Sequence, residues 1–295
     1  PNGTAMEIRA IVECKTLLGE GPLWDVAEQK LYWIDSLGNR IFRADQNGEG
    51  MESWPVPANM GSLALRDGGG AILSLADGLY TFDFETGRAE LVHKVAHKGA
   101  TVRLNDGKVD RRGRFVTGSL ETTETAPLAI LYSVGTDLGV TQIDDNITVS
   151  NGPCWSPDHS IFYFADSRSR AIWAYDYDIE TGKVSNKRKF VDFGAEDGLP
   201  DGATVDSEGC IWSAGVYRSK IHRFSPQGER LLTIDMPVVC VTSVMFGGPD
   251  LDRLYVTSMV RAPVPGVEET GPLAGSLFVI DGLGIKGLPE YRFGG

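Results

Sequence analysis

Short aromatic strands recur at nearly even intervals along the chain. Each is an apolar run rich in aromatic and β-branched residues, a pattern typical of buried strands. The copies are residues 31–35, 71–74, 114–118, 161–166, 210–214 and 253–257. A second strand type follows most of them, and turn sequences such as Glu85-Thr86-Gly87-Arg88 lead into a third. Each repeat therefore predicts several antiparallel strands joined by tight turns.

A further segment precedes each aromatic strand and sets the period. The six copies begin at Glu20, Ser62, Asn105, Asn151, Asp201 and Ser243, at spacings of 42, 43, 46, 50 and 42 residues. Six such units, each a small antiparallel sheet, predict an all-β fold, a six-bladed β-propeller with four-stranded antiparallel blades. We interpret residues 1–5 as a cloning remnant ahead of Met6 and residues 6–295 as a single propeller domain. Residues 7–12 are a candidate to complete the blade that contains residues 277–281.

Composition and charge narrow the class of partner. Glycine makes up 36 of 295 residues, which suits a turn-rich β protein, and the net charge is −12 without any basic run. We therefore expect no nucleic-acid and no membrane partner. The apolar runs are far shorter than the roughly 20 residues that cross a bilayer. Four scattered cysteines indicate free thiols in a reducing compartment, so we expect a cytoplasmic protein. The default expectation is a monomer, with a small molecule as its partner.

The six starting positions share one chemical property. In a propeller the first strand of each blade lines the central channel, and all six of these side chains carry oxygen. Turn formation would explain Asn151-Gly152 and Asp201-Gly202, but it does not explain Glu20. Unpaired buried carboxylates cost several kcal/mol, a cost that a cation would remove. Oxygen donors suit a divalent metal ion, with calcium favoured, magnesium and manganese as alternatives, and zinc or iron(II) also open.

Five motifs, in order, give the sequence a family resemblance. They are Leu18-Gly19-Glu20-Gly21-Pro22-Leu23-Trp24 and the segments 103–110, 150–153, 200–202 and 246–250. Together they resemble the SMP-30/gluconolactonase/regucalcin family of six-bladed propellers, and the resemblance extends over residues 6–293. Any one motif is weak alone, whereas five in the right order are specific.

The resemblance also implies roles for individual residues. It implies one divalent metal ion held by Glu20, Asn151 and Asp201, and substrate contacts from Arg103 and Asn105. A further acidic substrate contact follows the strand at residues 114–118. We assign this contact to Glu121, with Glu124 as the alternative, because a gapless alignment falls between them on Thr123.

The implied activity is hydrolysis of sugar lactones (aldonolactones) to aldonic acids in carbohydrate catabolism, the work of a carboxylic ester hydrolase. The ion would polarise the lactone carbonyl, and Asp201 is the candidate general base. Two alternatives stay open: a calcium-binding regulatory protein, and a propeller hydrolase that acts on organophosphates or aromatic esters. A serine hydrolase is disfavoured because the sequence has no G-x-S-x-G motif.

Overall fold

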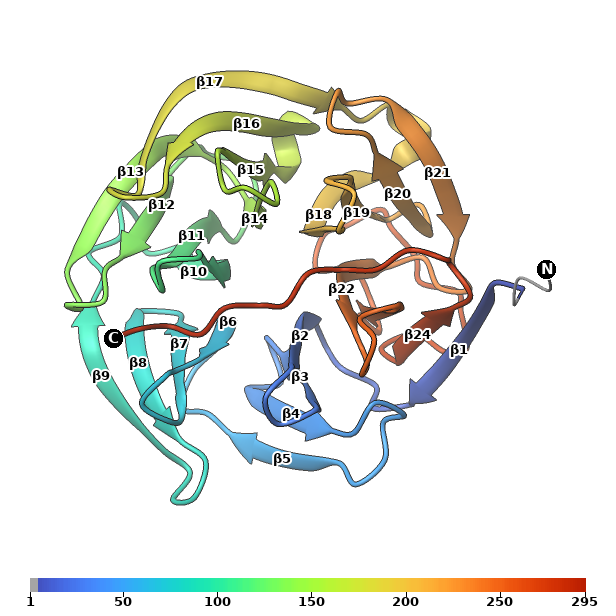
Figure 1. Cartoon of the computed structure of the whole chain (residues 1–295), viewed down its shortest axis with the longest axis horizontal. Helices are drawn as coiled ribbons and strands as arrows, with labels where there is room; N and C mark the ends of the chain where they lie inside the picture. The colour runs from blue at the N-terminus through green and yellow to red at the C-terminus, as the bar shows by residue number, and fades with distance from the viewer. Residues whose placement is uncertain (1–4) are drawn as a thin grey trace.

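A computed structural model describes residues 5–295, so the segment that we interpret as a cloning remnant lies outside the described residues except for Ala5. Six four-stranded antiparallel sheets surround a central axis, which confirms the predicted six-bladed β-propeller (Figure 1). Blades 1 to 3 comprise β2 (Gly19–Asp25), β3 (Lys30–Asp35), β4 (Arg40–Ala44), β5 (Glu52–Pro55); β6 (Met60–Leu65), β7 (Ala71–Leu75), β8 (Gly78–Asp83), β9 (Arg88–Lys94); and β10 (Val102–Val109), β11 (Phe115–Glu121), β12 (Ala129–Val134), β13 (Val140–Ile147).

Blades 4 and 5 follow the same order, and blade 6 takes its fourth strand from the start of the chain. They comprise β14 (Ser150–Trp155), β15 (Ile161–Asp166), β16 (Ala171–Asp178), β17 (Lys183–Asp192); β18 (Leu199–Val205), β19 (Ile211–Val216), β20 (Lys220–Phe224), β21 (Arg230–Asp235); and β22 (Val241–Gly247), β23 (Arg253–Ser258), β24 (Leu277–Asp281), β1 (Glu7–Val12). Two 3-10 turns, η1 (Ser167–Ser169) and η2 (Ala195–Asp197), are the helical elements within residues 5–295, and neither is long enough to cross a membrane.

The ring closes by pairing β1 with β24. Ile8 lies opposite Ile280 in this antiparallel pair, and Arg9 Nη2 donates to Asp281 Oδ2 at 3.0 Å. This pairing confirms the expected partner of residues 7–12. Since β1 joins strands formed by the other end of the chain, the last blade cannot be completed by local contacts alone.

The core lies between neighbouring blades. Strand side chains alternate between the two faces of each sheet, and the inner strands are buried on both faces, which explains their nearly continuous apolar runs. Trp212 of blade 5, for example, packs edge-on against Phe246 of blade 6, with ring centroids 5.5 Å apart. All four cysteines are unpaired, and three of them are buried, as expected for free thiols.

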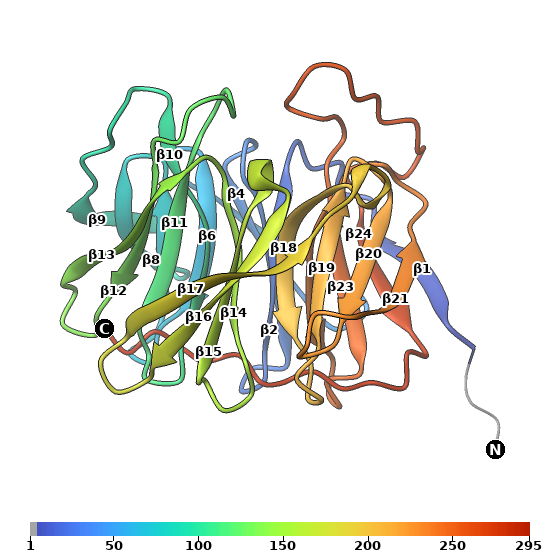
Figure 2. The ribbon, with the colours of Figure 1, turned by 90° about the horizontal axis from the view of Figure 1, so that it is seen from above.

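A segment after the last strand, residues 282–295, crosses the lower face of the propeller (Figures 1 and 2). We call it the C-terminal strap. It contacts every blade through Asp25, Leu65, Gly113, His159, Ser207 and Leu251 in turn. Phe293 is its anchor: this side chain is fully buried beside Phe115, and its N–H donates to the Leu65 carbonyl at 2.8 Å. The strap therefore closes the lower end of the channel, while the loop after β23 stands above the upper end.

Candidate metal centre and substrate cavity

A cavity opens at the upper end of the axis. It encloses about 790 Å³ including the space at its mouth, a size suited to a small-molecule ligand. Its lining combines polar and apolar side chains. The polar ones include Glu20, Arg103, Asn105, Glu124, Asn151 and Asp201, and the apolar ones include Leu18, Leu37, Leu199, Val216, Tyr217 and Met259. We call this space the upper cavity.

Irregular strand pairing directs the side chains of the three candidate metal ligands into the cavity. In β2, β14 and β18 the register with the next strand shifts beside Glu20, Asn151 and Asp201, respectively. Such bulges bend a strand and re-aim its side chains. Each candidate is followed by glycine, and Gly21 and Gly152 have φ of 54° and 58°, values that side chains with a Cβ rarely adopt. The glycines in the motifs therefore make the bulges possible.

Glu20 and Asp201 are buried carboxylates, and each has one oxygen without a partner among the described residues. Both side chains are less than 9% exposed, and neither Glu20 Oε2 nor Asp201 Oδ1 accepts a hydrogen bond from any described residue. Burial raises the pKa of both carboxyl groups, and the negative charges of Asp201 and Asp106 raise the pKa of Glu20 further. The unpaired oxygens and the mutual repulsion both favour a cation at this position.

Two amides complete the oxygen-rich wall. Asn105 Nδ2 donates to the Ser150 carbonyl at 2.8 Å and to Asn151 Oδ1 at 3.1 Å. The amide nitrogen of Asn105 is thus engaged, and both side chains are buried where they line the upper cavity. The structure therefore brings the three predicted metal ligands and Asn105 to one cavity.

Arg103 adds a positive charge to the same wall. Its Nη1 donates to the Leu104 carbonyl at 3.0 Å, and the side chain is 8% exposed. Burial lowers the pKa of Arg103 to about 10, although the nearby charges of Glu20 and Glu124 act in the opposite direction. The guanidinium stays protonated near neutral pH and can donate hydrogen bonds to a polar ligand.

The two candidate acids of the third blade occupy different environments. The Glu121 carboxylate folds back onto its own turn, where Thr123 Oγ1 donates at 2.7 Å and the Thr125 N–H donates at 2.9 Å. These hydrogen bonds lower the pKa of Glu121 to about 2, and the bond from the Thr125 N–H contributes most. Glu124 lines the upper cavity and accepts from Arg168 Nη2 at 2.8 Å, whereas Glu121 does not line it. Of the two candidates for the acidic substrate contact, Glu124 therefore lies at the cavity and Glu121 does not.

The charges of the site fit one divalent cation. Glu20 and Asp201 supply two negative charges, and each has an oxygen without a partner. Asn151 supplies a neutral amide oxygen. Calcium, magnesium and manganese all accept such oxygen donors, whereas none of the three ligands offers the thiolate or imidazole that a zinc site most often uses. The donor set therefore fits the predicted ion class, with hard ions preferred.

A second acidic group lies near the lower face but has no free oxygen at its centre. Asp206, Glu208 and Cys210 converge there. Asp206 Oδ1 accepts from the Glu208 and Cys210 N–H groups, and Oδ2 accepts from Trp212 Nε1 and Arg223 Nε, all at 2.9–3.0 Å. These bonds make Asp206 a turn-forming residue, so this group does not compete with the upper cavity as a metal site.

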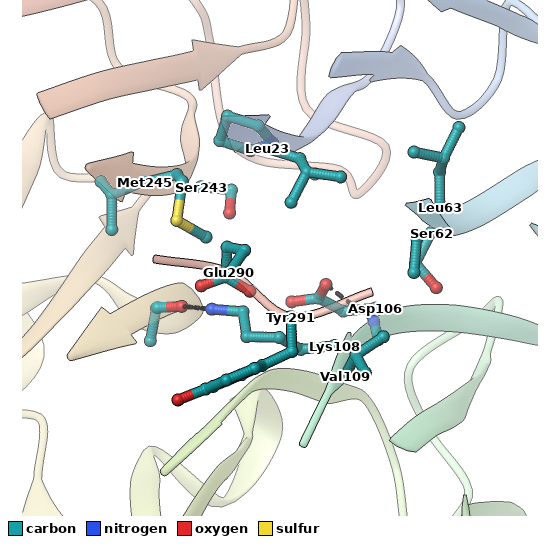
Figure 3. Close-up of a pocket in the computed structure, with 16 residues that line it drawn as sticks. Leu23, Ser62, Leu63, Asp106, Lys108, Val109, Ser243, Met245, Glu290 and Tyr291 are labelled. Atoms are coloured by element: carbon teal, nitrogen blue, oxygen red, sulfur yellow. Dashed lines mark hydrogen bonds between the residues drawn. The ribbon is translucent and has the colours of Figure 1, made fainter. Parts of the chain in front are cut away.

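The lower end of the channel contains a different arrangement (Figure 3). Asp106, Lys108 and Glu290 line the same space, and Lys108 Nζ donates to the Ala203 carbonyl at 2.9 Å. Burial raises the pKa of Asp106 and Glu290, and the Lys108 charge opposes both shifts. Ser62 and Ser243 also lie here. We call this space the lower cavity, and the strap residues Glu290 and Tyr291 form its floor.

The sequence patterns do not single out several polar residues of the upper cavity, among them Asn59, Thr122 and Ser167. Ser167 lies directly after β15. The Asp-Ser pair that ends the aromatic strand, present at both 35–36 and 166–167, could have indicated Ser167. Tyr217 also lines the cavity. Its φ of 74° is rare for an aromatic residue, and no local sequence pattern predicts it.

Known proteins resemble this chain over its whole length. Residues 18–260 match the family described as the SMP-30/gluconolactonase/LRE-like region. The chain belongs to this family. Regucalcin of Bos taurus is 35% identical over 303 residues, which cover 99% of this chain and 100% of that protein. Family membership confirms the resemblance that the five motifs carry.

Solved structures agree with this assignment. A luciferin-regenerating enzyme superimposes with a TM-score of 0.91 at 30% identity, over 98% of this chain and 99% of that one. A calcium-binding protein, regucalcin, from Agrobacterium tumefaciens gives a TM-score of 0.89 at 26% identity, over 98% and 97% of the two chains. The fold is thus shared along nearly the full length of both proteins.

Proposed function

We propose that the protein is a metal-dependent hydrolase that opens sugar lactones to aldonic acids. The observation that carries this proposal is the pair of buried, unpartnered carboxylate oxygens of Glu20 and Asp201 beside Arg103 in a cavity of small-molecule size. Membership in a family whose description includes gluconolactonases supports the reaction class. Localisation in the cytoplasm and a monomeric state stay predictions from the sequence.

Glu20, Asn151 and Asp201 would hold the ion. A bound divalent cation supplies a Lewis acid that polarises a carbonyl oxygen. The ion also offsets the repulsion between the two carboxylates, which explains how both can stay ionised in a buried site. Calcium is our first choice, since carboxylate and amide oxygens with open space for water suit its flexible coordination.

Asp201 is the proposed general base. Its Oδ1 lacks a partner in the protein, so it can accept a proton from a water molecule in the cavity. Arg103 and Asn105 lie on the same polar wall and would bind the ring oxygen and hydroxyls of the lactone. Glu124, rather than Glu121, would accept a hydrogen bond from a sugar hydroxyl, because its carboxylate lines the cavity.

A calcium-binding regulatory role is the second candidate. It is favoured by the full-length similarity to regucalcins, of which the Agrobacterium tumefaciens protein is described as calcium-binding. An arginine beside a candidate calcium site favours the enzyme, because an ion site alone gains nothing from an adjacent positive charge. Because the cavity also has apolar lining residues, hydrolysis of aromatic esters or organophosphates is a third candidate activity to test.

One assay separates these functions. Ring opening of gluconolactone, xylonolactone, arabinonolactone and galactonolactone releases acid, which a pH indicator reports, and an aryl acetate serves as the ester control. We expect lactone turnover that disappears after chelation and returns with calcium, magnesium or manganese. Calcium binding without turnover of any lactone would favour the regulatory role, and faster turnover of the aryl ester would favour the third class.

A further inference from the structure

The Ser167 hydroxyl connects two of the proposed metal-binding segments. Ser167 begins η1 directly after β15, and its side chain is 3% exposed at the wall of the upper cavity. Its Oγ donates to the Pro200 carbonyl at 2.7 Å, and it accepts from Asn151 Nδ2 at 2.9 Å. Pro200 immediately precedes Asp201. One hydroxyl thus touches both the Asn151 side chain and the strand that presents Asp201.

The direction of these bonds is fixed by the groups at their ends. A carbonyl oxygen only accepts, so the Pro200 carbonyl takes the single proton of the Ser167 hydroxyl. The hydroxyl can then only accept from Asn151, which therefore presents its NH₂ group to Ser167. At the other end, the Ser150 carbonyl fixes Asn105 Nδ2 as a donor, and the same nitrogen donates to Asn151 Oδ1. Every hydrogen bond in this series favours the same orientation of the Asn151 amide.

We propose that Ser167 is a positioning residue that sets the Asn151 amide with its oxygen toward the ion. An amide has one end that can bind a cation and one end that repels it, so its orientation decides whether it is a ligand at all. This inference rests on the proposed metal site. Groups that orient metal ligands typically change metal affinity by about 10- to 100-fold when they are removed.

Blade 1 contains a natural control for this role. Ser36 lies 16 residues after Glu20, as Ser167 lies 16 residues after Asn151. The Ser36 hydroxyl donates to the Met60 carbonyl of the next blade, so it makes the same kind of blade-to-blade bond. Among the described residues no hydrogen bond joins Ser36 to Glu20, and a carboxylate has two equivalent oxygens that need no such choice of orientation. Ser36 therefore shares the structural role of Ser167 without the orienting role.

The test measures calcium affinity by titration calorimetry in wild type, Ser167→Ala, Ser167→Thr and Ser36→Ala, together with the thermal stability of each protein without metal. We expect Ser167→Ala to bind calcium about 10- to 100-fold more weakly. Ser167→Thr keeps the hydroxyl and should stay within a few-fold of wild type, as should Ser36→Ala. Both alanine variants should lose similar thermal stability without metal, because both lose a blade-to-blade bond.

The outcomes distinguish this inference from the function on which it rests. Unchanged calcium affinity in Ser167→Ala, with a stability loss like that of Ser36→Ala, would overturn the orienting role. A wild-type protein that binds no divalent ion would instead overturn the proposed metal site. If the alanine variant does not fold, Ser167→Cys keeps nearly the same volume with a poor hydrogen-bonding group, and a wild-type calcium affinity in that variant would overturn the inference in the same way.

Discussion

The two ends of the channel differ in the hydrogen bonds that their buried carboxylate oxygens accept. At the lower end Asp106 Oδ1 and Oδ2 accept from the N–H groups of Gly107 and Gly152 at 2.8 and 2.9 Å, and the strap closes the cavity beneath. At the upper end Glu20 and Asp201 each keep an oxygen without a partner, and the cavity stays open. The chain thus satisfies the oxygens of Asp106 with its own backbone N–H groups. Glu20 Oε2 and Asp201 Oδ1 have no such donor, although Arg103 lies in the same cavity, and there we expect a bound ion.

The largest effect should follow from a change at the upper end. Asp201→Asn removes the proposed base and one of the two ligand charges while keeping the shape of the side chain. Loss of a general base alone lowers turnover by about 10²- to 10⁴-fold, so we expect aldonolactone hydrolysis to fall at least that far, with weakened calcium binding. The pH-indicator assay measures the first and calorimetry the second. Substantial residual turnover would remove Asp201 from the base role.

A change at the lower end should affect stability instead. Phe293→Ala removes the buried anchor of the strap, and loss of a buried phenylalanine costs about 3–5 kcal/mol in the free energy of unfolding. Because Phe293 lies far from the polar wall of the upper cavity, the KM for the lactone should stay near the wild-type value at a temperature where the variant is folded. Chemical denaturation measures the stability. A large rise in KM with little loss of stability would show that the two ends are not independent.

The smallest effect should distinguish the two acids of the third blade. Glu124→Gln changes a carboxylate that lines the upper cavity, and loss of one charged hydrogen bond to substrate costs about 1.5–3 kcal/mol, equivalent to roughly a 10- to 100-fold loss in kcat/KM. Glu121→Gln is the matched variant, and it should act on the local turn with little change in kcat/KM. The opposite ranking in steady-state kinetics would restore Glu121 as the substrate contact.

The periodicity of the sequence predicted the fold because the inner strands of every blade are buried on both faces. The same apolar pattern therefore recurs once per blade. The shared phase also predicted that Glu20, Asn151 and Asp201 would lie together. Phase alone did not predict their height in the channel. In β6 and β22 the register shift precedes Ser62 and Ser243, whereas in β2 and β14 it follows Glu20 and Asn151. The two serines consequently lie at the lower cavity, although they share the phase of the other four residues.

Other parts of the site depend on contacts that no repeat encodes. Glu124 lines the cavity because the turn after β11 places it in the left-handed region, with a φ of 56°. Ser167 can orient Asn151 only because the fold brings Pro200 and Asn151, which are 49 residues apart, to one hydroxyl. The strap has no blade-like period at all. These features arise from tertiary neighbours, which a single sequence does not reveal.

The strap also constrains the order in which the molecule can be assembled. Its residues follow all 24 strands found within residues 5–295, so a ribosome synthesises them after every surface on which they dock. Because Glu290 and Tyr291 lie in the strap, the floor of the lower cavity forms only when the strap docks. The base of the propeller is therefore sealed late in folding, after the blades that the strap contacts have formed their surfaces.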